Sequence, residues 1–328
     1  MTSYEKNILA FNEQLTVDVV KTADLGKLGK GGAPDAIVVV GMGGSGLVAS
    51  LLQNLANDVT IPVPVIPWKN FGLPELSYVE RPLYLFVSFS GGTKEVLDGF
   101  RLARKIGKAR VAVVTSGGEL LRIAEESRLP RASFPAHDLA PRQATGIMFY
   151  GSLAVLRSIW PSMKAPNLSA KVSPERFRAE AKRIAGVIGS GNAAVFAEGE
   201  DSHLAYFWKV HLNETGKTFA SWNVLPEMNH NEIVGFELRP KAVTAIFLVG
   251  NPKDARAKAI REVTAAIIER YGTRTVTVEP TGKTRIERTM NSLALGALTS
   301  VELAKFKGID PKETRIIEEI KKKISKFR

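Results

Sequence analysis

The first third of the chain alternates short, continuous apolar runs with segments whose apolar residues recur at helical spacing. The run from Ala36 to Val40 is rich in β-branched residues, which indicates a strand buried on both faces of a parallel sheet. Leu83 to Val87 and Arg110 to Thr115 repeat this pattern. Each of the three runs ends in a polar, glycine-rich turn, as strands of βαβ units do. We therefore expect an α/β fold with a central parallel sheet.

The pattern restarts in the second half of the chain. In the first half, the run from Ile61 to Trp68 carries three prolines and predicts an edge or loop-rich strand. The proline-rich stretch 161–174 then indicates a linker between the halves. Beyond it we expect helices at 174–188 and 203–214, strands at 193–196, 243–249 and 274–278, and two closing helices. The sequence thus predicts two doubly wound α/β domains, over residues 1–160 and 161–328.

Composition narrows the class of protein. The 328 residues are 45% hydrophobic and 24% charged, which is typical of a soluble globular protein of about two domains. No apolar run reaches the ~18 residues that a membrane span needs, and the N-terminus lacks a signal-peptide pattern, so we expect a cytoplasmic protein without a membrane partner. The lack of cysteine excludes disulfides, thiolate nucleophiles and cysteine-based zinc sites. No His, Asp or Glu cluster has ligand spacing, so we expect no metal and no other cofactor.

The net charge is +12, from 45 basic and 33 acidic residues, which favours an anionic partner such as a phosphorylated metabolite or a nucleic acid. The densest basic run lies between Glu318 and Phe327, where the spacing predicts an amphipathic helix with a solvated lysine face. The charge therefore does not by itself indicate nucleic acid, and we expect none as a partner.

The turn from Gly41 to Gly46 satisfies G-x-G-x-x-G between a predicted strand and a predicted helix. A dinucleotide site of this kind also needs an acidic residue about 20 positions later, and the segment from Val65 to Lys69 has none. A bare tight turn and another phosphate or sugar role both remain open.

A second turn is more specific, because Ser88, Ser90 and Thr93 place three hydroxyls between a strand and a helix N-terminus. Unpaired amides there carry partial positive charge and suit a phosphate dianion, and Gly91 lets the backbone curl around it. An ordinary serine or threonine N-cap would use one hydroxyl and leave two unexplained. No G-K-[ST] follows, so a nucleotide triphosphate is not indicated.

The sequence S-x-S-G-x-T resembles the phosphate-binding signature of sugar isomerase (SIS) domains. Three further segments resemble the bifunctional phosphoglucose/phosphomannose isomerases: His211–Glu214, Pro226–Glu232 and Val301–Lys305. The resemblance covers about residues 36–320. It implies two SIS-type domains in a homodimer whose active site is shared between subunits. It also implies metal-independent interconversion of glucose 6-phosphate, and of mannose 6-phosphate, with fructose 6-phosphate.

The resemblance implies a role for each matching residue. Glu214 is the base that moves a proton between C1 and C2 through a cis-enediol(ate), and Arg142 stabilises the enediolate without giving up its own proton. His230, from the neighbouring subunit, and Lys305 open the sugar ring. Without the resemblance, each of these four residues has an ordinary structural alternative. The glutamate would be a surface residue, the arginine would begin a helix, the histidine would be structural and the lysine would be solvated.

The resemblance also implies the phosphate site. The side chains that bind phosphate are Ser45, Ser88, Ser90 and Thr93, and the backbone close to substrate belongs to Gly44 and Gly91. One position departs from the family pattern. Dual-specificity members have a threonine seven positions before the catalytic lysine, where this chain has Leu298, with Thr299 beside it.

Three other functions remain as alternatives. A non-catalytic sugar-phosphate-binding SIS regulator usually carries a DNA-binding helix-turn-helix, and the 35 residues before the first long strand are too few for one. An amino-sugar-phosphate isomerase lacks the N-H-N-E and V-E-L-x-K segments. A nucleotide-dependent oxidoreductase would rest on the glycine-rich turn alone.

Overall fold

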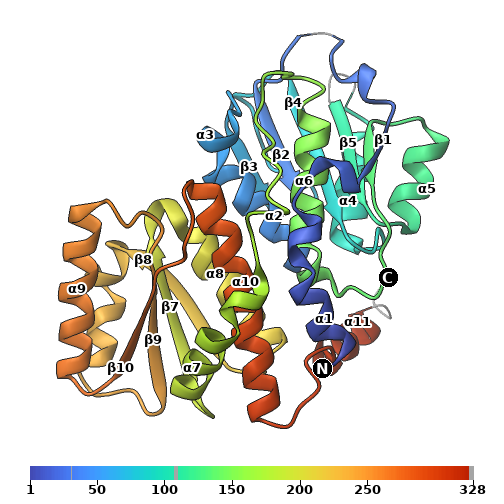
Figure 1. The fold of residues 1–328 in the computed structure, drawn as a ribbon. Coiled ribbons are helices and arrows are strands. Elements are labelled where there is room, and N and C mark those ends of the chain that lie inside the picture. Colours follow the sequence, from blue (N-terminus) through green and yellow to red (C-terminus); the bar gives the residue numbers. More distant parts are fainter. Residues whose placement is uncertain (31, 107–109, 325–328) are drawn as a thin grey trace.

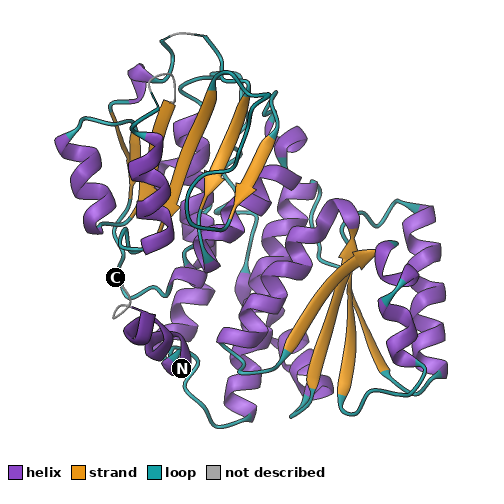
Figure 2. Cartoon of the chain, turned by 180° about the vertical axis from the view of Figure 1, so that it is seen from behind, coloured by secondary structure: helices purple, strands orange, loops and turns teal. Residues whose placement is uncertain are grey.

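The computed structural model describes residues 1–30, 32–106 and 110–324. Two β-sheets lie in separate halves of the molecule, and helices flank both of them (Figures 1 and 2). The first sheet has the described strands in the order β1-β6-β5-β4-β2-β3, and the second has the order β10-β9-β7-β8. The strands of the first sheet are β1 (Lys21–Ala23), β2 (Ala36–Val40), β3 (Val65–Trp68), β4 (Pro82–Ser88), β5 (Arg110–Thr115) and β6 (Arg131–Ser133). Those of the second are β7 (Asn192–Glu198), β8 (Ala220–Leu225), β9 (Val243–Leu248) and β10 (Arg274–Val278).

The helices before the second sheet are α1 (Ser3–Leu9), α2 (Gly43–Asn54), α3 (Ala56–Val59), α4 (Lys94–Ala103), α5 (Gly118–Glu126), α6 (Thr145–Leu156) and α7 (Arg178–Ile188). Those after β7 are α8 (Ser202–Glu214), α9 (Ala255–Arg270), α10 (Arg285–Phe306) and α11 (Arg315–Ile324). None of the helices in the described residues combines the length and apolar character that crossing a bilayer requires.

The predicted α/β class with parallel sheets is confirmed. All described strand pairs are parallel except β1 with β6. Every residue of β2 is buried, as its continuous apolar run predicts. The proline-containing run also behaves as predicted, because β3 lies at the edge of its sheet, although only Val65–Trp68 forms the strand. The described residues contain three further strands that the sequence did not predict, namely β1, β6 and β8.

A central layer of helices joins the two halves. One continuous apolar core contains buried residues of α2 and α6 from the first half and of α8 and α10 from the second. Helix α10 packs against α7 and α8, and α2 packs against both α6 and α8. Trp208 is fully buried where α8 meets α10, and a Cβ on Gly296 would lie 2.8 Å from its indole ring. Burial of one shared core holds the two sheets in a fixed relation.

The predicted linker is irregular but tightly packed. No helix or strand is assigned between the end of α6 and the turn that begins at Pro174, and Met163, Leu168 and Val172 along it are buried. The division at residue 160 stays a prediction. The predicted C-terminal amphipathic helix is present as α11, and its described lysines are exposed. The end of that prediction, residues 325–327, lies outside the described residues.

Candidate active site

Arg142 is buried, with 3% of its surface exposed, in the short 3-10 helix η4 (Pro141–Gln143) that precedes α6. A buried guanidinium is costly unless its donors are paired. Here Nε donates to Tyr4 Oη (2.8 Å) and Thr215 Oγ1 (2.9 Å). The second nitrogen, Nη2, donates to the carbonyl oxygens of Pro311 (2.7 Å) and Lys312 (3.2 Å). The third, Nη1, donates to Glu214 Oε2 (3.2 Å). All three nitrogens form hydrogen bonds, so the plane of the guanidinium is fixed with Nη1 directed at Glu214. The predicted oxyanion stabiliser and the predicted base are therefore in contact.

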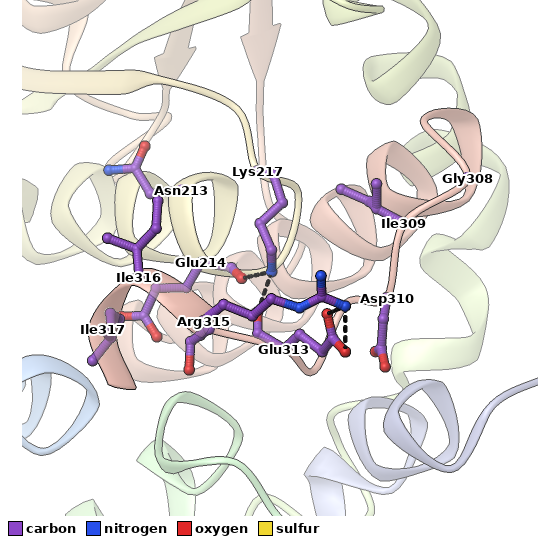
Figure 3. A pocket seen from close by; sticks show the side chains of 11 residues that line it. Asn213, Glu214, Lys217, Gly308, Ile309, Asp310, Glu313, Arg315, Ile316 and Ile317 are labelled. Atoms are coloured by element: carbon purple, nitrogen blue, oxygen red, sulfur yellow. Dashed lines mark hydrogen bonds and ion pairs between the residues drawn. The ribbon is translucent and has the colours of Figure 1, made fainter. Parts of the chain in front are cut away.

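Glu214 is the last residue of α8, so the predicted position at a helix C-terminal end is confirmed. Phe207 and His211, on the same face of α8, stack with ring centroids 4.3 Å apart. The Glu214 side chain is 26% exposed and lines a cavity of about 670 Å³, which also contacts Asn213, Lys217 and the segment before and within α11 (Figure 3). Lys217 Nζ donates to the backbone carbonyl of Glu214 (2.6 Å) and so fixes the end of the helix.

His211 is a structural residue of this site. It is fully buried, and its Nε2 donates to the carbonyl oxygen of Arg142 (3.2 Å). Burial and the nearby Arg142 charge lower the pKa of His211 to about 3. The ring is therefore neutral at physiological pH and supports the backbone of η4.

The predicted phosphate turn runs from the end of β4 into α4. Ser88 Oγ accepts from Gly91 N (3.1 Å), and Ser90 Oγ accepts from Gly92 N (3.3 Å). Thr93 is the N-cap residue of α4, but its side chain makes no capping bond and lies 3.1 Å from Ser88 Oγ. The ordinary N-cap alternative is therefore wrong for Thr93. The turn groups hydroxyls at the N-terminus of a ten-residue helix, where an anion is stabilised.

The first turn of α2 joins the phosphate turn to η4. Ser45 Oγ accepts from Phe89 N (3.0 Å), which is inside the phosphate turn. On the other side, a Cβ on Gly44 would lie 2.8 Å from the backbone of Pro141 and Arg142. Only glycine permits this approach. The first turn of α2 thus contacts both the phosphate turn and η4, whereas none of the predicted phosphate residues lines the cavity at Glu214.

Lys305 lies near the end of α10 and does not line the cavity at Glu214. Its Nζ donates to Glu302 Oε1 (2.6 Å) and Glu5 Oε1 (2.9 Å). Burial alone would lower the pKa of Lys305, but these two carboxylates outweigh it and raise the pKa above its usual value. The lysine is held as a cation, and its predicted role in ring opening stays a prediction.

His230 lies apart from Glu214 within this chain. Glu214 precedes β8, whereas His230 ends the 3-10 helix η7 (Glu227–His230) that follows β8. The two therefore lie at opposite ends of that strand, and His230 is exposed. Its predicted contribution to a neighbouring subunit's site stays a prediction.

The specificity position predicted near Leu298 and Thr299 stays a prediction. Leu298 and Thr299 are both buried within α10, and Thr299 Oγ1 donates to the carbonyl of Leu295 (2.9 Å). Neither lines the cavity. In the described part of the chain, no three His, Asp or Glu side chains are grouped so that they could hold a metal ion.

Two residues of the Arg142 network were not predicted from the sequence. Tyr4 and Thr215 both contact Nε of Arg142, and their oxygens are 2.8 Å apart. A lone tyrosine in an amphipathic N-terminal pattern looks like an ordinary core residue. The only available signal for Thr215 was its place directly after Glu214.

Several known proteins are similar to this chain in sequence or in fold. Residues 177–324 match the family described as the bacterial phospho-glucose isomerase C-terminal SIS domain. A bifunctional phosphoglucose/phosphomannose isomerase from Aquifex aeolicus (strain VF5) is 30% identical over 296 residues, covering 88% of this chain and 90% of the relative. A D-glucosamine-6-phosphate 4-epimerase from Sulfolobus acidocaldarius is 26% identical, with coverage of 88% and 89%. The C-terminal domain of glucosamine-fructose-6-phosphate aminotransferase from Francisella tularensis shares the fold, with a TM-score of 0.71 at 13% identity and coverage of 94% and 97%. On its sequence identity and its coverage, the chain belongs to the family of bifunctional phosphoglucose/phosphomannose isomerases.

Proposed function

We propose that this protein is an aldose–ketose isomerase that interconverts glucose 6-phosphate and mannose 6-phosphate with fructose 6-phosphate. The observation that carries the proposal is the contact between Arg142 Nη1 and Glu214 Oε2, tied through α2 to the phosphate turn. The name of the Aquifex relative supports the choice of substrates. A non-catalytic sugar-phosphate sensor would not need a carboxylate paired with a buried guanidinium beside the turn.

The proposed reaction is a proton transfer between two adjacent carbons. Ser88, Ser90 and Thr93 hold the phosphate, with the amides of the turn and Ser45 supporting them. Glu214 removes the proton from one of the two carbons C1 and C2, and the electron pair forms a cis-enediol(ate). Arg142 stabilises the negative oxygen, and because guanidinium does not deprotonate it does not compete for the proton. The carboxylic acid then returns the proton to the other carbon, while the hydroxyl proton passes from the oxygen of one carbon to the oxygen of the other, so no net oxidation occurs.

The proposed active enzyme is a homodimer. Ring opening is assigned to Lys305 and to His230 of a second copy, because His230 lies across β8 from Glu214 in its own chain. In this arrangement the half formed by residues 1–160 binds phosphate, and the half formed by 161–328 supplies the base and the ring-opening groups.

The test is the Glu214→Gln variant with fructose 6-phosphate in deuterated water. Loss of the base should lower kcat by at least about a hundredfold, while the phosphate turn still binds substrate. The wild-type aldose products should carry deuterium at C2. Glu313→Gln is the matched control, because Glu313 lines the same cavity and pairs with exposed Arg315. A Glu214→Gln variant that keeps most of its turnover would overturn the proposal.

Product identification separates this function from that of the Sulfolobus relative. Wild-type protein should convert fructose 6-phosphate into both glucose 6-phosphate and mannose 6-phosphate. The same preparation should leave glucosamine 6-phosphate unchanged. Inversion at C4 of glucosamine 6-phosphate, without isomerisation of fructose 6-phosphate, would contradict the proposed function.

A further inference from the structure

Helix α1 lies outside both sheets, beside α10 and near α11 (Figure 1). Two consecutive polar residues of this helix, Tyr4 and Glu5, are almost fully buried, with 3% and 2% of their surfaces exposed. Neighbouring helix positions point about 100° apart, so the two side chains reach different partners. Buried polar groups of this kind require hydrogen-bond partners.

Tyr4 contacts the guanidinium of Arg142. Its Oη accepts from Nε (2.8 Å) and lies 2.8 Å from Thr215 Oγ1, and its ring centroid is 5.2 Å from the guanidinium carbon. Burial raises the pKa of Tyr4, so its hydroxyl stays protonated. Tyr4 thus contacts Nε of the guanidinium, whereas Nη1 contacts Glu214.

Glu5 contacts the ammonium group of Lys305. Its Oε1 accepts from Lys305 Nζ (2.9 Å) and from Arg178 Nη1 of α7 (2.6 Å). Burial alone would raise the pKa of Glu5, but the two cations outweigh it and lower the pKa below its usual value. Glu5 is therefore an ionised carboxylate that ties α10 to α1 and α7.

We propose that α1 is a positioning element of the active site, in which Tyr4 orients Arg142 and Glu5 orients Lys305. This inference rests on the proposed function, because the roles of Arg142 and Lys305 come from it. The partners lie 138 and 300 positions away in the sequence, so one short helix aligns groups from both halves of the chain.

Near-isosteric substitutions separate positioning from packing. Tyr4→Phe keeps the ring against Arg142 and removes only the hydroxyl. Glu5→Gln keeps the shape of the side chain and removes the charge. A helix that only packs would lose stability in these variants without a change in kinetics.

Tyr4→Phe should lower kcat for fructose 6-phosphate about tenfold with little change in KM. The hydroxyl acts through Arg142 on an oxyanion that forms only during the reaction, so its loss is felt in kcat. Tyr150→Phe is the matched control, because this buried tyrosine donates to the Pro166 carbonyl (2.6 Å) away from the site. The control should lower the melting temperature and leave kcat unchanged.

Glu5→Gln should move the alkaline limb of the kcat/KM pH profile to lower pH. The charged groups around Lys305 are Glu302 on α10 and Glu5 on α1, with Arg178 of α7 facing Glu5. Removing the Glu5 charge takes away one of the carboxylates that stabilise the ammonium, so Lys305 loses its proton at lower pH. Glu5→Asp keeps a negative charge at this position, so its alkaline limb should lie between those of the wild type and of Glu5→Gln. If Glu5→Gln does not fold, the aspartate variant carries the test, with a smaller shift expected.

The outcomes separate the two proposals. If wild-type protein isomerises fructose 6-phosphate but Tyr4→Phe keeps full kcat and the Glu5 variants keep the wild-type pH profile, α1 is a packing element and this inference is wrong. If wild-type protein does not isomerise fructose 6-phosphate, the proposed function fails first. A fall in kcat for Tyr4→Phe, together with a shifted alkaline limb for the Glu5 variants, supports α1 as a positioning element.

Discussion

At the scale of single residues, the site depends on a buried guanidinium whose geometry is fully specified. Within residues 1–30, 32–106 and 110–324, the Arg142 side chain contacts three side-chain oxygens and two backbone carbonyls, and only the contact with Glu214 joins it to a carboxylate. Neutral oxygens orient the cation without cancelling its charge. In the proposed reaction, the remaining positive potential stabilises the negative oxygen of the enediolate.

Arg142→Lys should lower kcat/KM for fructose 6-phosphate by about a hundredfold or more. Lysine keeps the charge, but its donors leave a single nitrogen and cannot reproduce the planar fork. Steady-state kinetics give the ratio. Arg81→Lys is the control, since Arg81 forms an exposed pair with Asp35 and its variant should match the wild type. An Arg142→Lys enzyme within threefold of the wild type would show that the fork geometry is unimportant.

At the scale of elements, the phosphate turn is shaped by a second turn that follows β5. Leu120 N donates to the carbonyl of Gly91 (2.9 Å), and Ser116 Oγ donates to the carbonyl of Phe89 (2.5 Å). Gly91 has φ +64°, and a Cβ there would lie 1.8 Å from the carbonyl oxygen of Gly117. The turns after β4 and β5 therefore pack closely against each other, and this contact leaves no room for a side chain at position 91.

Gly91→Ala should lower the free energy of unfolding by about 2–4 kcal/mol and weaken substrate binding, because the added methyl both strains the left-handed backbone and forces the turns apart. Urea unfolding and calorimetric titration with fructose 6-phosphate measure the two effects. Gly92→Ala is the stability control, since nothing lies within 4 Å of a Cβ there. Equal stability of the two alanine variants would refute the close packing of the turns.

At the scale of the whole molecule, the shared core buries two histidines that cannot accept a proton while folded. Burial, helped by Arg285 near His203 and by Arg142 near His211, lowers the pKa of each to about 3. In the unfolded chain both return to the ordinary value of 6.5. Below that pH the unfolded state binds more protons, so stability is lost as the pH falls.

Between about pH 7 and about pH 5.5, protonation of these two histidines in the unfolded state should lower the free energy of unfolding by about 2.5 kcal/mol. Urea unfolding at a series of pH values measures this slope. His137→Asn should leave the slope unchanged, because His137 is exposed. Stability that stays flat across this interval would contradict neutral burial of His203 and His211.

Much of this organisation was determined by the sequence itself. Continuous apolar runs predicted β2, β4 and β5 because a strand covered on both faces has no polar position. Hydroxyls and glycines predicted the phosphate turn because a local backbone geometry requires them. The resemblance to the isomerase family, which the Aquifex relative confirms, predicted the catalytic roles of Glu214 and Arg142. Local pattern also placed Glu214 at the end of a helix.

Only the tertiary structure decided which distant side chains meet. Strands β1 and β6 have three residues each, too few to produce a periodic signal. They are defined by their pairing, β1 with β6 and β6 also with β5. Tyr4 and Glu5 look like one turn of an amphipathic helix, and their importance comes from partners that packing brings from other parts of the chain. Apolar periodicity records how much of a side chain is buried. The partner of a buried polar group is chosen by how remote elements pack, and a local pattern does not contain that information.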